Sequence, residues 1–581
     1  YPKLIQSSSK LLSERIGLCN MGSHVNNKRI MHQLIILTFA VGYGATENSD
    51  LPSLQLSEDL FSSTSKLEGL VAKEQAVVQM LEMYAAETKA HLQTIERYIK
   101  EYKLVISGVS SAHNLVANPI DAYMLVKRTT VEWDGVERAI YLMANRSRGV
   151  FDQVLDFRHD QFFPNQEDLN GAAIALVRLH DTYRLNMTDL ANGILKGTPS
   201  SKTDYFHSQQ DLGARDCLFL GKHAFNRGYF DTAVQWAEAA ISKVESGDET
   251  LGKREILSFL DMAVRVHDET LERRGPLGAY WQTNPVPIDK HLRNIHKEKY
   301  STLAKSKFIP KLWREQTDDE ETEHYERLCR GEKMLPAVVE AKLFCYHVTR
   351  NHPYLLLQPL KVEETSRNPS IVIIHDLLND GQLTKFKELA EPKLHSSRHK
   401  SSNGQGFVKS MIRTSKNAWL EESDDPMLSK ISKRITTATG LLVQEKTSAE
   451  DYQVANYGIG GLYVTHTDHL MHNPDPNSYG PWERLIGDRL ATLMVYLTDV
   501  EAGGATVFPR AGVTLWPEKG AAAFWYNLYR SGEGDDNTRH GACPVLHGSK
   551  WVSNKWIRYN DQFLTAQCGL HKLDKYRLMD G

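Results

Sequence analysis

The sequence lacks an excess of charge of either sign and lacks a long apolar run. With 69 basic and 72 acidic residues its net charge is -3, so the charge does not indicate nucleic acid or an anionic membrane as a partner. Its most apolar early run, residues 34–41, is far shorter than the roughly 20 residues that span a bilayer. No later segment is apolar enough, so we expect no membrane span. A chain of 581 residues suggests about three or four domains.

The first 45 residues do not resemble part of a fold. Residues 1–30 show no sustained periodicity, whereas Lys28 and Arg29 precede the apolar run 34–41, and small residues follow it. This is the layout of a secretory signal peptide, although a buried N-terminal strand is an alternative. We therefore expect residues 1–45 to be a non-native extension plus a signal peptide, and the mature protein to be lumenal.

Cysteine usage fits an oxidising compartment. Setting aside Cys19 in the extension leaves five cysteines. Two pairs are close in sequence, and bridging a short loop is worth about 3 kcal/mol in the chain-entropy model. The fifth cysteine would remain a buried free thiol, and sequence alone does not fix the connectivity. The close pairs are Cys329 with Cys345 and Cys543 with Cys568, the fifth cysteine is Cys217, and two sequons begin at Asn145 and Asn186.

A long helix is expected near the start of the mature chain. Apolar residues recur at a 3–4 spacing from Leu67 to Tyr102, broken only at Glu74 and Thr88. This pattern predicts an amphipathic helix with a narrow coiled-coil-like seam. The helix either packs within its own domain or serves self-association, and the pattern leaves both open. We assign residues 50–160 to an N-terminal helical domain.

The next region, residues 161–285, carries the small-residue spacing of a tetratricopeptide helix pair. Small residues allow two helices to approach closely. A second pair is poorly matched over 256–280, and Gly275-Pro276 breaks the pattern. Nearby aromatic residues either pack in the core or line a groove for a polyproline II ligand. The small-residue positions are Leu220, Gly221, Ala224, Ala233, Ala237 and Ala240, and the aromatic residues are Phe219, Phe225, Tyr229, Phe230 and Trp236.

A change of charge separates this helical half from a β-rich half. Residues 290–314 are basic and residues 318–326 are acidic, which favours a solvated linker over 286–325. After Pro369, short β-rich runs are punctuated by Gly and Pro, as in an all-β sandwich or barrel. Helices from 380–440 would cover one face. The predicted fold class is α+β and multidomain.

Two histidines and one aspartate form the strongest candidate site. His466 and Asp468 are two residues apart, so in a strand they project to the same face. His540, from a later strand, would complete two imidazoles and one carboxylate. Such a set occupies one face of an octahedral ion and leaves three positions open, as in non-haem Fe(II) oxygenases. His469 and His472 lie nearby, but His469 should face away and His472 could be a surface residue.

Lys550 strengthens this interpretation because it begins a β-rich run ten residues after His540. A buried cation there can pair with the distal carboxylate of 2-oxoglutarate while the other end of that molecule chelates iron. The alternative is a solvated strand lysine. Lys555 is the obvious rival, but an odd separation places it on the opposite face of the strand.

Residues from about 325 to 568 closely resemble the catalytic domain of the collagen prolyl 4-hydroxylase α subunit. The resemblance continues more loosely through the repeat region and the N-terminal helices, so it spans nearly all of the mature chain. The matching stretches are Asn456–Gly461, His466–Asp468, Gly503–Pro509, Phe524–Leu528, Ser531–Gly534, Thr538–His540, Ala542–Leu546 and Lys550–Trp556.

The resemblance implies a double-stranded β-helix (jelly roll) with flanking helices over 326–581, Fe(II) on His466, Asp468 and His540, and 2-oxoglutarate on Lys550. O2 would be the cosubstrate, and ascorbate would rescue oxidised iron. It also implies N-terminal dimerisation over 50–160, a tetratricopeptide-like peptide-binding domain, protein disulfide isomerase as the β subunit, and the endoplasmic reticulum lumen. The implied peptide groove contains Phe225, Tyr229, Phe230 and Phe259, and the implied disulfides are Cys329–Cys345 and Cys543–Cys568.

The implied reaction is 4-hydroxylation of proline in collagen-like X-Pro-Gly chains, coupled to decarboxylation of 2-oxoglutarate. A related dioxygenase acting on another secreted Pro-rich protein is one alternative. A non-catalytic adaptor that keeps the barrel as a scaffold is another, and the intact set of iron ligands and Lys550 argues against it.

Four positions depart from the family pattern. Thr465 stands where the family usually has Pro, and Phe259 and Met262 stand where it presents tyrosines. Arg558 stands where the family has a histidine near the iron. Alternation from Lys550 places Arg558 on the face of that lysine if the strand is unbroken, which favours an inward position that holds the carboxylate of 2-oxoglutarate; the alternative is that Arg558 is displaced outward.

Overall fold

The computed structural model describes most of the chain beyond its first 61 residues. The predicted extension and signal peptide, residues 1–45, therefore lie outside the described residues, as does the first part of the predicted linker, 286–309. Within the described part, no helix combines the length and the apolar character that crossing a membrane requires. The described residues are 62–107, 133–160, 166–208, 211–274, 310–350, 352–396, 398–400, 407–409, 414–458, 460–472 and 475–576.

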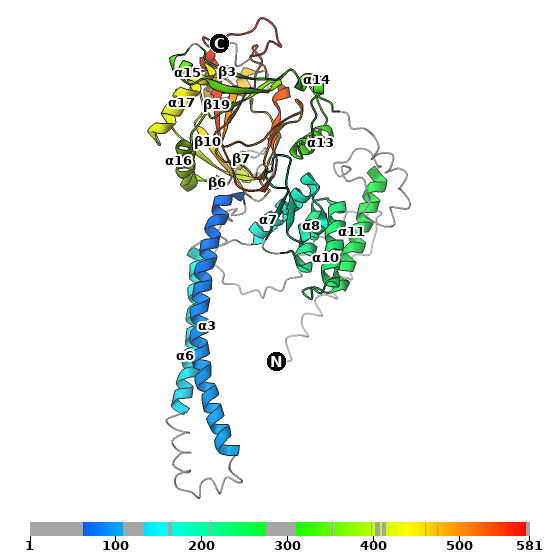
Figure 1. The fold of residues 1–581 in the computed structure, drawn as a ribbon, viewed down its shortest axis with the longest axis vertical. Helices are drawn as coiled ribbons and strands as arrows, with labels where there is room; N and C mark the ends of the chain where they lie inside the picture. Colours follow the sequence, from blue (N-terminus) through cyan, green and yellow to red (C-terminus); the bar gives the residue numbers. More distant parts are fainter. Residues whose placement is uncertain are drawn as a thin grey trace, which may run out of the picture. The chain divides into compact units, whose positions relative to one another are not determined.

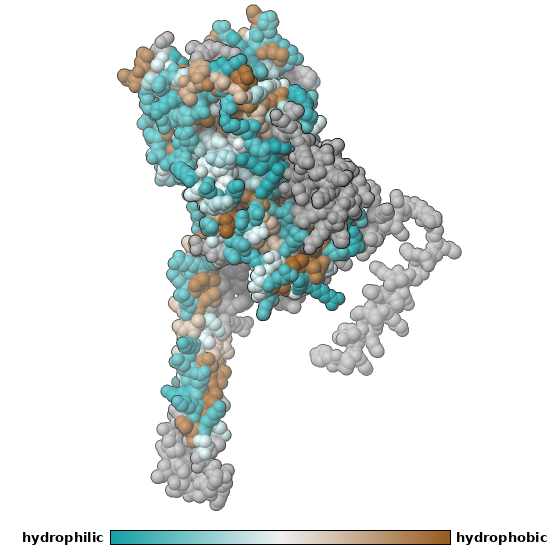
Figure 2. All heavy atoms as spheres, turned by 45° about the vertical axis from the view of Figure 1, so that its right-hand side comes forward, coloured by the Kyte–Doolittle hydropathy of each residue, from teal (hydrophilic) through white to brown (hydrophobic). Residues whose placement is uncertain are grey.

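The apolar spacing from Leu67 to Tyr102 falls within one continuous helix, α3 (Thr64–Ser107). A second helix, α6 (Trp133–Asp160), lies beside it (Figure 1). Much of the seam remains uncovered, since Val71 is 66% exposed and Tyr102 is 48% exposed. Figure 2 shows apolar side chains at the surface of this helix pair.

The small residues of the predicted repeat bring helices together. The pair α9 (Ala214–Asn226) and α10 (Phe230–Glu245) is joined by a short turn, and α11 (Lys253–Arg274) packs against α10. A Cβ atom on Gly221 would lie 3.1 Å from Cβ of Trp236, so any larger residue would require the neighbouring side chains to shift by a few tenths of an ångström. The preceding elements are α7 (Gln166–Tyr183), α8 (Met187–Ala191), β1 (Ile194–Lys196) and β2 (Tyr205–His207).

The prediction of a solvated linker is wrong over 318–325, because these residues belong to helix α13 (Asp318–Cys329). Thr317 caps the helix because its hydroxyl accepts a hydrogen bond from the Glu320 N–H, and the Glu320 carboxylate accepts one from the Thr317 N–H. Glu321 is buried against Arg539 of the β-rich half. The acidic run therefore reflects ion pairing within the fold and not a solvated segment.

The β-rich half is built on a nine-stranded antiparallel sheet and a four-stranded antiparallel sheet. In the large sheet the strand order is β3-β4-β5-β16-β12-β19-β10-β9-β6, and in the small one it is β11-β17-β14-β15. The strands of the large sheet are β3 (Cys345–Val348), β4 (Leu360–Arg367), β5 (Ser370–His375), β6 (His395–Ser396), β9 (Ser415–Leu420), β10 (Tyr452–Tyr457), β12 (Arg489–Tyr496), β16 (Ala522–Tyr526) and β19 (Lys550–Arg558). Those of the small sheet are β11 (Tyr463–His466), β14 (Thr506–Phe508), β15 (Val513–Leu515) and β17 (His540–Ala542), while β7 (Arg398–Lys400) pairs with β8 (Phe407–Lys409) and β13 (Ala502–Gly503) with β18 (Val545–His547).

Successive side chains of the central strands point to opposite faces of the sheet and pack into two separate hydrophobic cores. On β10, Val454 joins a core beneath helices, whereas Ala455 joins a core shared with Phe508 of the small sheet. The helices that cover the outer face include α16 (Asp380–Ala390) and α17 (Pro426–Thr439). Strand β12 contributes to both cores, which explains its nearly continuous apolar sequence. The remaining short helices are α14 (Ala337–Glu340), α15 (Pro353–Leu357) and α18 (Pro481–Ile486).

Candidate active site

Strand pairing brings the two predicted histidines together. His466 is the last residue of β11 and His540 is the first residue of β17, and the two are directly paired across the antiparallel ladder. Asp468 lies beyond the end of β11, so strand alternation is not what aligns it with His466. Donor atoms of the three side chains nevertheless lie within 4.8 Å of one another. Nε2 of each histidine is 3.7 Å from a carboxylate oxygen of Asp468.

Each histidine is oriented by its own strand. Nδ1 of His466 lies 2.9 Å from the Val464 carbonyl oxygen, and Nδ1 of His540 lies 3.0 Å from the Thr538 carbonyl oxygen. A carbonyl accepts only from a protonated nitrogen, so the proton of a neutral imidazole is kept on Nδ1. Nε2 of both rings is then left with its lone pair toward Asp468, which is the form that binds a metal ion.

Asp468 is held as a carboxylate. Thr492 donates its hydroxyl to Oδ2 of Asp468 at 2.7 Å, and Asn527 donates to that hydroxyl at 2.9 Å. Burial raises the pKa of Asp468, but His540, His466, Arg489 and this hydrogen bond together lower it to about 2. The aspartate is therefore ionised at neutral pH, and a carboxylate with two neutral imidazoles suits a divalent ion such as Fe(II).

Lys550 shares a cavity of about 240 Å³ with the three candidate ligands. Its side chain is 1% exposed, its ammonium donates to the Gly504 carbonyl at 2.6 Å, and it lies 5.1 Å from the ring centroid of Tyr457. No carboxylate partner is seen for it among the described residues. Burial lowers the pKa of Lys550 to about 7. A bound dicarboxylate would supply the missing counter-charge.

Lys555 faces the other side of β19, as the alternation predicts. Its ammonium lies 4.2 Å from the ring centroid of Tyr452 and 3.8 Å from Glu422, beneath the covering helices. It does not line the cavity, whereas Lys550, Val552, Asn554 and Trp556 do.

Arg558 is not where the sequence predicts it. It is not among the residues that line the cavity, and its guanidinium binds Glu450 and the Gly487 carbonyl. The pairing of β12 with β19 shifts register between Arg489 and Ala491, opposite the end of β19. The extra residue of this irregularity belongs to β12, so it does not interrupt alternation along β19; Arg558 is the last residue of that strand and lies beyond the residues that line the cavity.

The cavity residues that were not singled out from the sequence include Tyr463, Arg489 and Trp556. The ring of Tyr463 stacks on His466 at 3.7 Å between centroids, and the guanidinium of Arg489 lies 3.8 Å from the Trp556 ring centroid. The alternation that separates Lys550 from Lys555 also points to Trp556. No comparable signal marks Arg489, because it lies at the start of β12.

The two nearby histidines take no part in the cluster of candidate ligands. His469 is 3% exposed and lies 3.3 Å from Asp536, and His472 is exposed. Neither lines the cavity. Because β11 ends at His466, the reason given for excluding His469, continued alternation, does not apply.

The predicted disulfides are wrong, because Cys329 is bonded to Cys543, with the two Cα atoms 5.5 Å apart. Cys345 and Cys568 are free and exposed, and Cys217 is free and buried. Short sequence separation favoured the local pairs, but α13 packs over the strand that carries His540. Both bonded cysteines lie at 0% exposure in one core.

Helix α13 braces β17 at two further positions. Arg539 binds the carboxylate of Glu321 through Nε and Nη2 at 2.9–3.1 Å. The hydroxyl of Tyr325 donates to the Ala542 carbonyl at 2.9 Å. Arg539, directly before β17, and Ala542, its last residue, are thus both fixed to one helix, which holds His540 in place.

The aromatic residues predicted to line a peptide groove form a cluster in the helical region. Phe225 lies 5.2 Å from Phe230 and 6.0 Å from Phe259 between ring centroids. Phe259 is 6% exposed, so it packs in the core, whereas Phe225, Tyr229 and Phe230 are half-buried.

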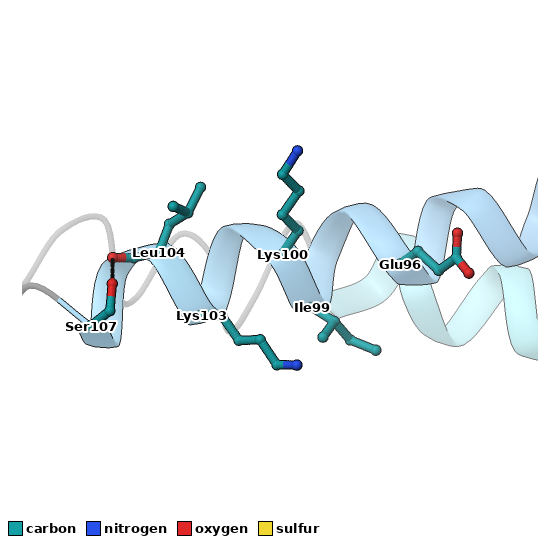
Figure 3. A pocket seen from close by; sticks show the side chains of 6 residues that line it. All are labelled: Glu96, Ile99, Lys100, Lys103, Leu104 and Ser107. Carbon is teal, nitrogen blue, oxygen red and sulfur yellow. Dashed lines mark hydrogen bonds between the residues drawn. The ribbon is translucent and has the colours of Figure 1, made fainter.

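A second hollow, of about 540 Å³, lies on α3 near its C-terminal end. Figure 3 shows that its labelled side chains diverge from the helix instead of converging on a point. All of them come from one helix, and the only hydrogen bond among them joins Ser107 to the Leu104 carbonyl. This hollow has no arrangement that could perform chemistry.

The families that this chain matches are consistent with the candidate iron and 2-oxoglutarate site. Residues 452–558 match the 2OG-Fe(II) oxygenase superfamily, and residues 63–197 match the N-terminal region of the prolyl 4-hydroxylase α subunit. The fold and site thus define an oxygenase that uses Fe(II) and 2-oxoglutarate. The chain is 36% identical to prolyl 4-hydroxylase subunit alpha-2 of Gallus gallus, over 89% of this chain and 96% of that protein. It is 34% identical to subunit alpha-1 of Homo sapiens, over 90% of this chain and 98% of that protein.

The chain therefore belongs to the prolyl 4-hydroxylase α-subunit family. Among solved structures, the viral collagen prolyl hydroxylase of Paramecium Bursaria Chlorella virus-1, in complex with 2-oxoglutarate, is 26% identical. That match covers 32% of this chain and 95% of the viral chain, with a TM-score of 0.25.

Proposed function

We propose that this chain hydroxylates C4 of proline in collagen-like X-Pro-Gly sequences. In the balanced reaction, one O2 provides one oxygen atom to the new hydroxyl group and one to succinate, while 2-oxoglutarate loses CO2. The observation that carries the proposal is the presence of Lys550 and the His466, Asp468 and His540 cluster in one cavity of about 240 Å³.

In this proposal the cluster would hold Fe(II), which supplies the redox chemistry that couples O2 reduction to decarboxylation. His466 and His540 offer Nε2, and Asp468 offers a carboxylate oxygen that Thr492 orients. Three protein ligands leave open positions for the cosubstrates. Lys550 would bind the distal carboxylate of 2-oxoglutarate and so orient its other end toward the cluster.

The remaining wall of the cavity suits a proline ring. Tyr463 and Trp556 present aromatic surfaces, and Trp525 packs edge-on against His540 at 4.8 Å between ring centroids. Flat apolar walls exclude water and accept a stiff polyproline II chain with little loss of entropy. The groove residues Phe225, Tyr229 and Phe230, with Phe259 beneath them, would hold the chain at a distance from the reacting proline.

Several finer features belong to the same proposal. The two sheets form the double-stranded β-helix of the catalytic domain, and α9, α10 and α11 form the tetratricopeptide-like peptide-binding domain. The exposed seam of α3 mediates self-association, and protein disulfide isomerase is the β subunit in the endoplasmic reticulum lumen. Ascorbate returns oxidised iron to Fe(II). The carbohydrate acceptors are Asn145 and Asn186, both of which are exposed.

A panel of peptides tests this function. The chain, co-expressed with a disulfide isomerase, is incubated with Fe(II), 2-oxoglutarate and ascorbate, and hydroxyproline is located by mass spectrometry. We expect hydroxylation of prolines that precede glycine in a collagen-like peptide, and much less in a Pro-rich peptide without glycine. A preference for the glycine-free peptide would favour the alternative of another secreted Pro-rich substrate. A lack of turnover on every peptide, with an Asp468→Ala control giving the same background, would favour an adaptor.

A further inference from the structure

One carboxylate, that of Glu450, is shared by two arginines at the edge of the candidate active site. Its Oε1 accepts from Nε of Arg489 and from Nη2 of Arg558, both at 2.6 Å. Its Oε2 accepts from Nη2 of Arg489 at 2.8 Å. The side chains of Glu450, Arg489 and Arg558 are 16%, 15% and 8% exposed, so these ion pairs are shielded from water.

Of the two arginines, only Arg489 lines the cavity. Its guanidinium is fixed from one side by Glu450 and from another by the Trp556 ring, at 3.8 Å. Among the described residues, the hydrogen bonds of its side chain engage Nε and Nη2. Its Nη1 is thereby left for a ligand in the cavity, and a guanidinium held in a fixed plane binds a carbonyl group with little loss of entropy.

Arg558 ties Glu450 to the turn from which Arg489 projects. Its Nη1 donates to the Gly487 carbonyl at 3.0 Å, two residues before Arg489. In the ladder between β12 and β19, Arg489 and Arg558 are direct partners. Arg558 thus contacts both the carboxylate that orients Arg489 and the backbone that leads into it.

Position 558 is also far from the end of the strand where 2-oxoglutarate would bind. Lys550 and Arg558 are the first and last residues of β19, which at about 3.3 Å per residue places their Cα atoms roughly 25 Å apart. A short diacid that reaches from Lys550 to the ligand cluster does not extend to Arg558.

We propose that Arg558 is a positioning residue for the peptide substrate, and that it acts through Glu450 on Arg489. It maintains a second cation on the shared carboxylate, which holds Glu450 in place and leaves the Arg489 guanidinium aimed into the cavity. Because arginine stays charged throughout the physiological range, this arrangement does not depend on pH as a histidine at the same position would. The inference rests on the proposed function, since Arg489 would act on the peptide.

The test separates the Michaelis constants for peptide and for 2-oxoglutarate. Arg558→Met should raise the KM for a collagen-like peptide about tenfold, the effect of losing one charge-assisted hydrogen bond. The KM for 2-oxoglutarate and the affinity for Fe(II) should stay unchanged. Arg558→Lys should restore part of the peptide KM, because a cation remains next to Glu450. If Arg558→Met does not fold, the two KM values are instead compared in Arg558→Lys and Arg558→His, which keep a polar group next to Glu450.

A double-mutant cycle tests whether Arg558 acts on the peptide KM through Glu450. In a Glu450→Gln background, adding Arg558→Met should raise the peptide KM by less than twofold, because the shared carboxylate is already lost. Arg434→Met is the matched control, since Arg434 donates to the Leu377 carbonyl at 2.9 Å and does not line the cavity. It should leave both KM values unchanged.

Three results would overturn the proposal. The first is a raised KM for 2-oxoglutarate with an unchanged KM for peptide, which would place Arg558 on the cosubstrate. The second is full additivity in the cycle, and the third is no change in either KM. Failure of the wild-type chain to turn over any peptide would instead contradict the proposed function, so the two outcomes are distinguishable.

Discussion

His466 lies directly opposite His540 across the ladder between β11 and β17. Both imidazoles reach the carboxylate of Asp468 at 3.7 Å, although Asp468 itself lies outside the strand. The histidine pair is therefore set by backbone hydrogen bonding between strands, which is rigid, while the aspartate depends on side-chain partners. This division predicts which changes will remove the metal and which will only weaken its binding.

Replacement of His466, Asp468 or His540 by Ala should abolish turnover without unfolding the chain. Each removes one of the three proposed protein ligands, so we expect less than about a tenth of wild-type activity, equivalent to at least 1.4 kcal/mol in the barrier. Activity is measured as substrate-stimulated CO2 release, and folding by circular dichroism. A folded variant that retained more activity would show that the replaced side chain is not an essential ligand.

Thr492→Val should weaken metal binding without abolishing it. Val has nearly the shape of Thr but cannot donate to Oδ2 of Asp468, and loss of such an outer partner typically costs about 10–100-fold in metal affinity. The affinity is measured by titration with Co(II), monitored by its visible absorption. Thr514→Val is the matched control, because its hydroxyl donates to the Leu328 carbonyl away from the cluster. Equal affinities for both variants would contradict a role for Thr492 in orienting Asp468.

Lys550 should make 2-oxoglutarate binding depend on pH. Burial lowers its pKa to about 7 in the empty cavity, whereas a bound carboxylate requires the cation. Binding above neutral pH should therefore take up a proton, and the KM for 2-oxoglutarate should rise as pH increases through 7. Isothermal titration calorimetry in buffers of different ionisation enthalpy measures the proton uptake. Uptake that is absent at pH 8 would refute the assignment.

Two variants separate this effect from a structural one. Lys550→Met should raise the KM for 2-oxoglutarate at every pH and remove the proton uptake, with little change in the KM for peptide. Lys555→Met changes a buried lysine on the opposite face, whose pKa burial also lowers, to about 8. It should leave both KM values unchanged.

The lowered pKa of Lys550 also determines how the free energy of unfolding changes with pH. Between pH 7 and 10.5 the unfolded chain keeps a proton on Lys550 that the folded, ligand-free chain has lost. The unfolded state thus binds more protons in this window, so the contribution of Lys550 to the free energy of unfolding rises with pH. Lys550→Met should flatten this part of the stability profile, as measured by urea unfolding.

The sequence predicts those parts of the site that depend on local periodicity. Strand β19 is regular from Lys550 to Ile557, so alternation separates Lys550 from Lys555 correctly. Alternation does not reveal that Arg558, at the far end of the strand, lies outside the cavity and binds Glu450. Pairing between strands that are distant in sequence has no local signature, and Arg489 became visible as a cavity residue only in the structure.

The acidic segment of α13 shows the same limit. Its charge pattern resembles a solvated linker, but Glu321 pairs with Arg539, far along the chain. The pairing of Cys329 with Cys543 also depends on this packing, whereas sequence separation favoured shorter loops. Tertiary contacts, not local composition, decide both features.

The disulfide can be tested directly. Proteolysis under non-reducing conditions, followed by mass spectrometry, should yield a linked peptide pair that contains Cys329 and Cys543. Cys345 and Cys568 should be alkylated without reduction, because both are free and exposed. Linked peptides that join Cys329 to Cys345 would contradict the structure and support the local pairing.

The coupling of CO2 release to proline hydroxylation tests the central claim most directly. The wild-type chain, co-expressed with a disulfide isomerase, is supplied with a collagen-like peptide and with 2-oxoglutarate labelled at C1, the carbon that is released as CO2. Labelled CO2 and 4-hydroxyproline are then measured in the same samples. We predict one 4-hydroxyproline for each substrate-dependent CO2, and neither product from His540→Ala. Substrate-dependent CO2 without 4-hydroxyproline, or hydroxyproline that persists in His540→Ala, would contradict the account.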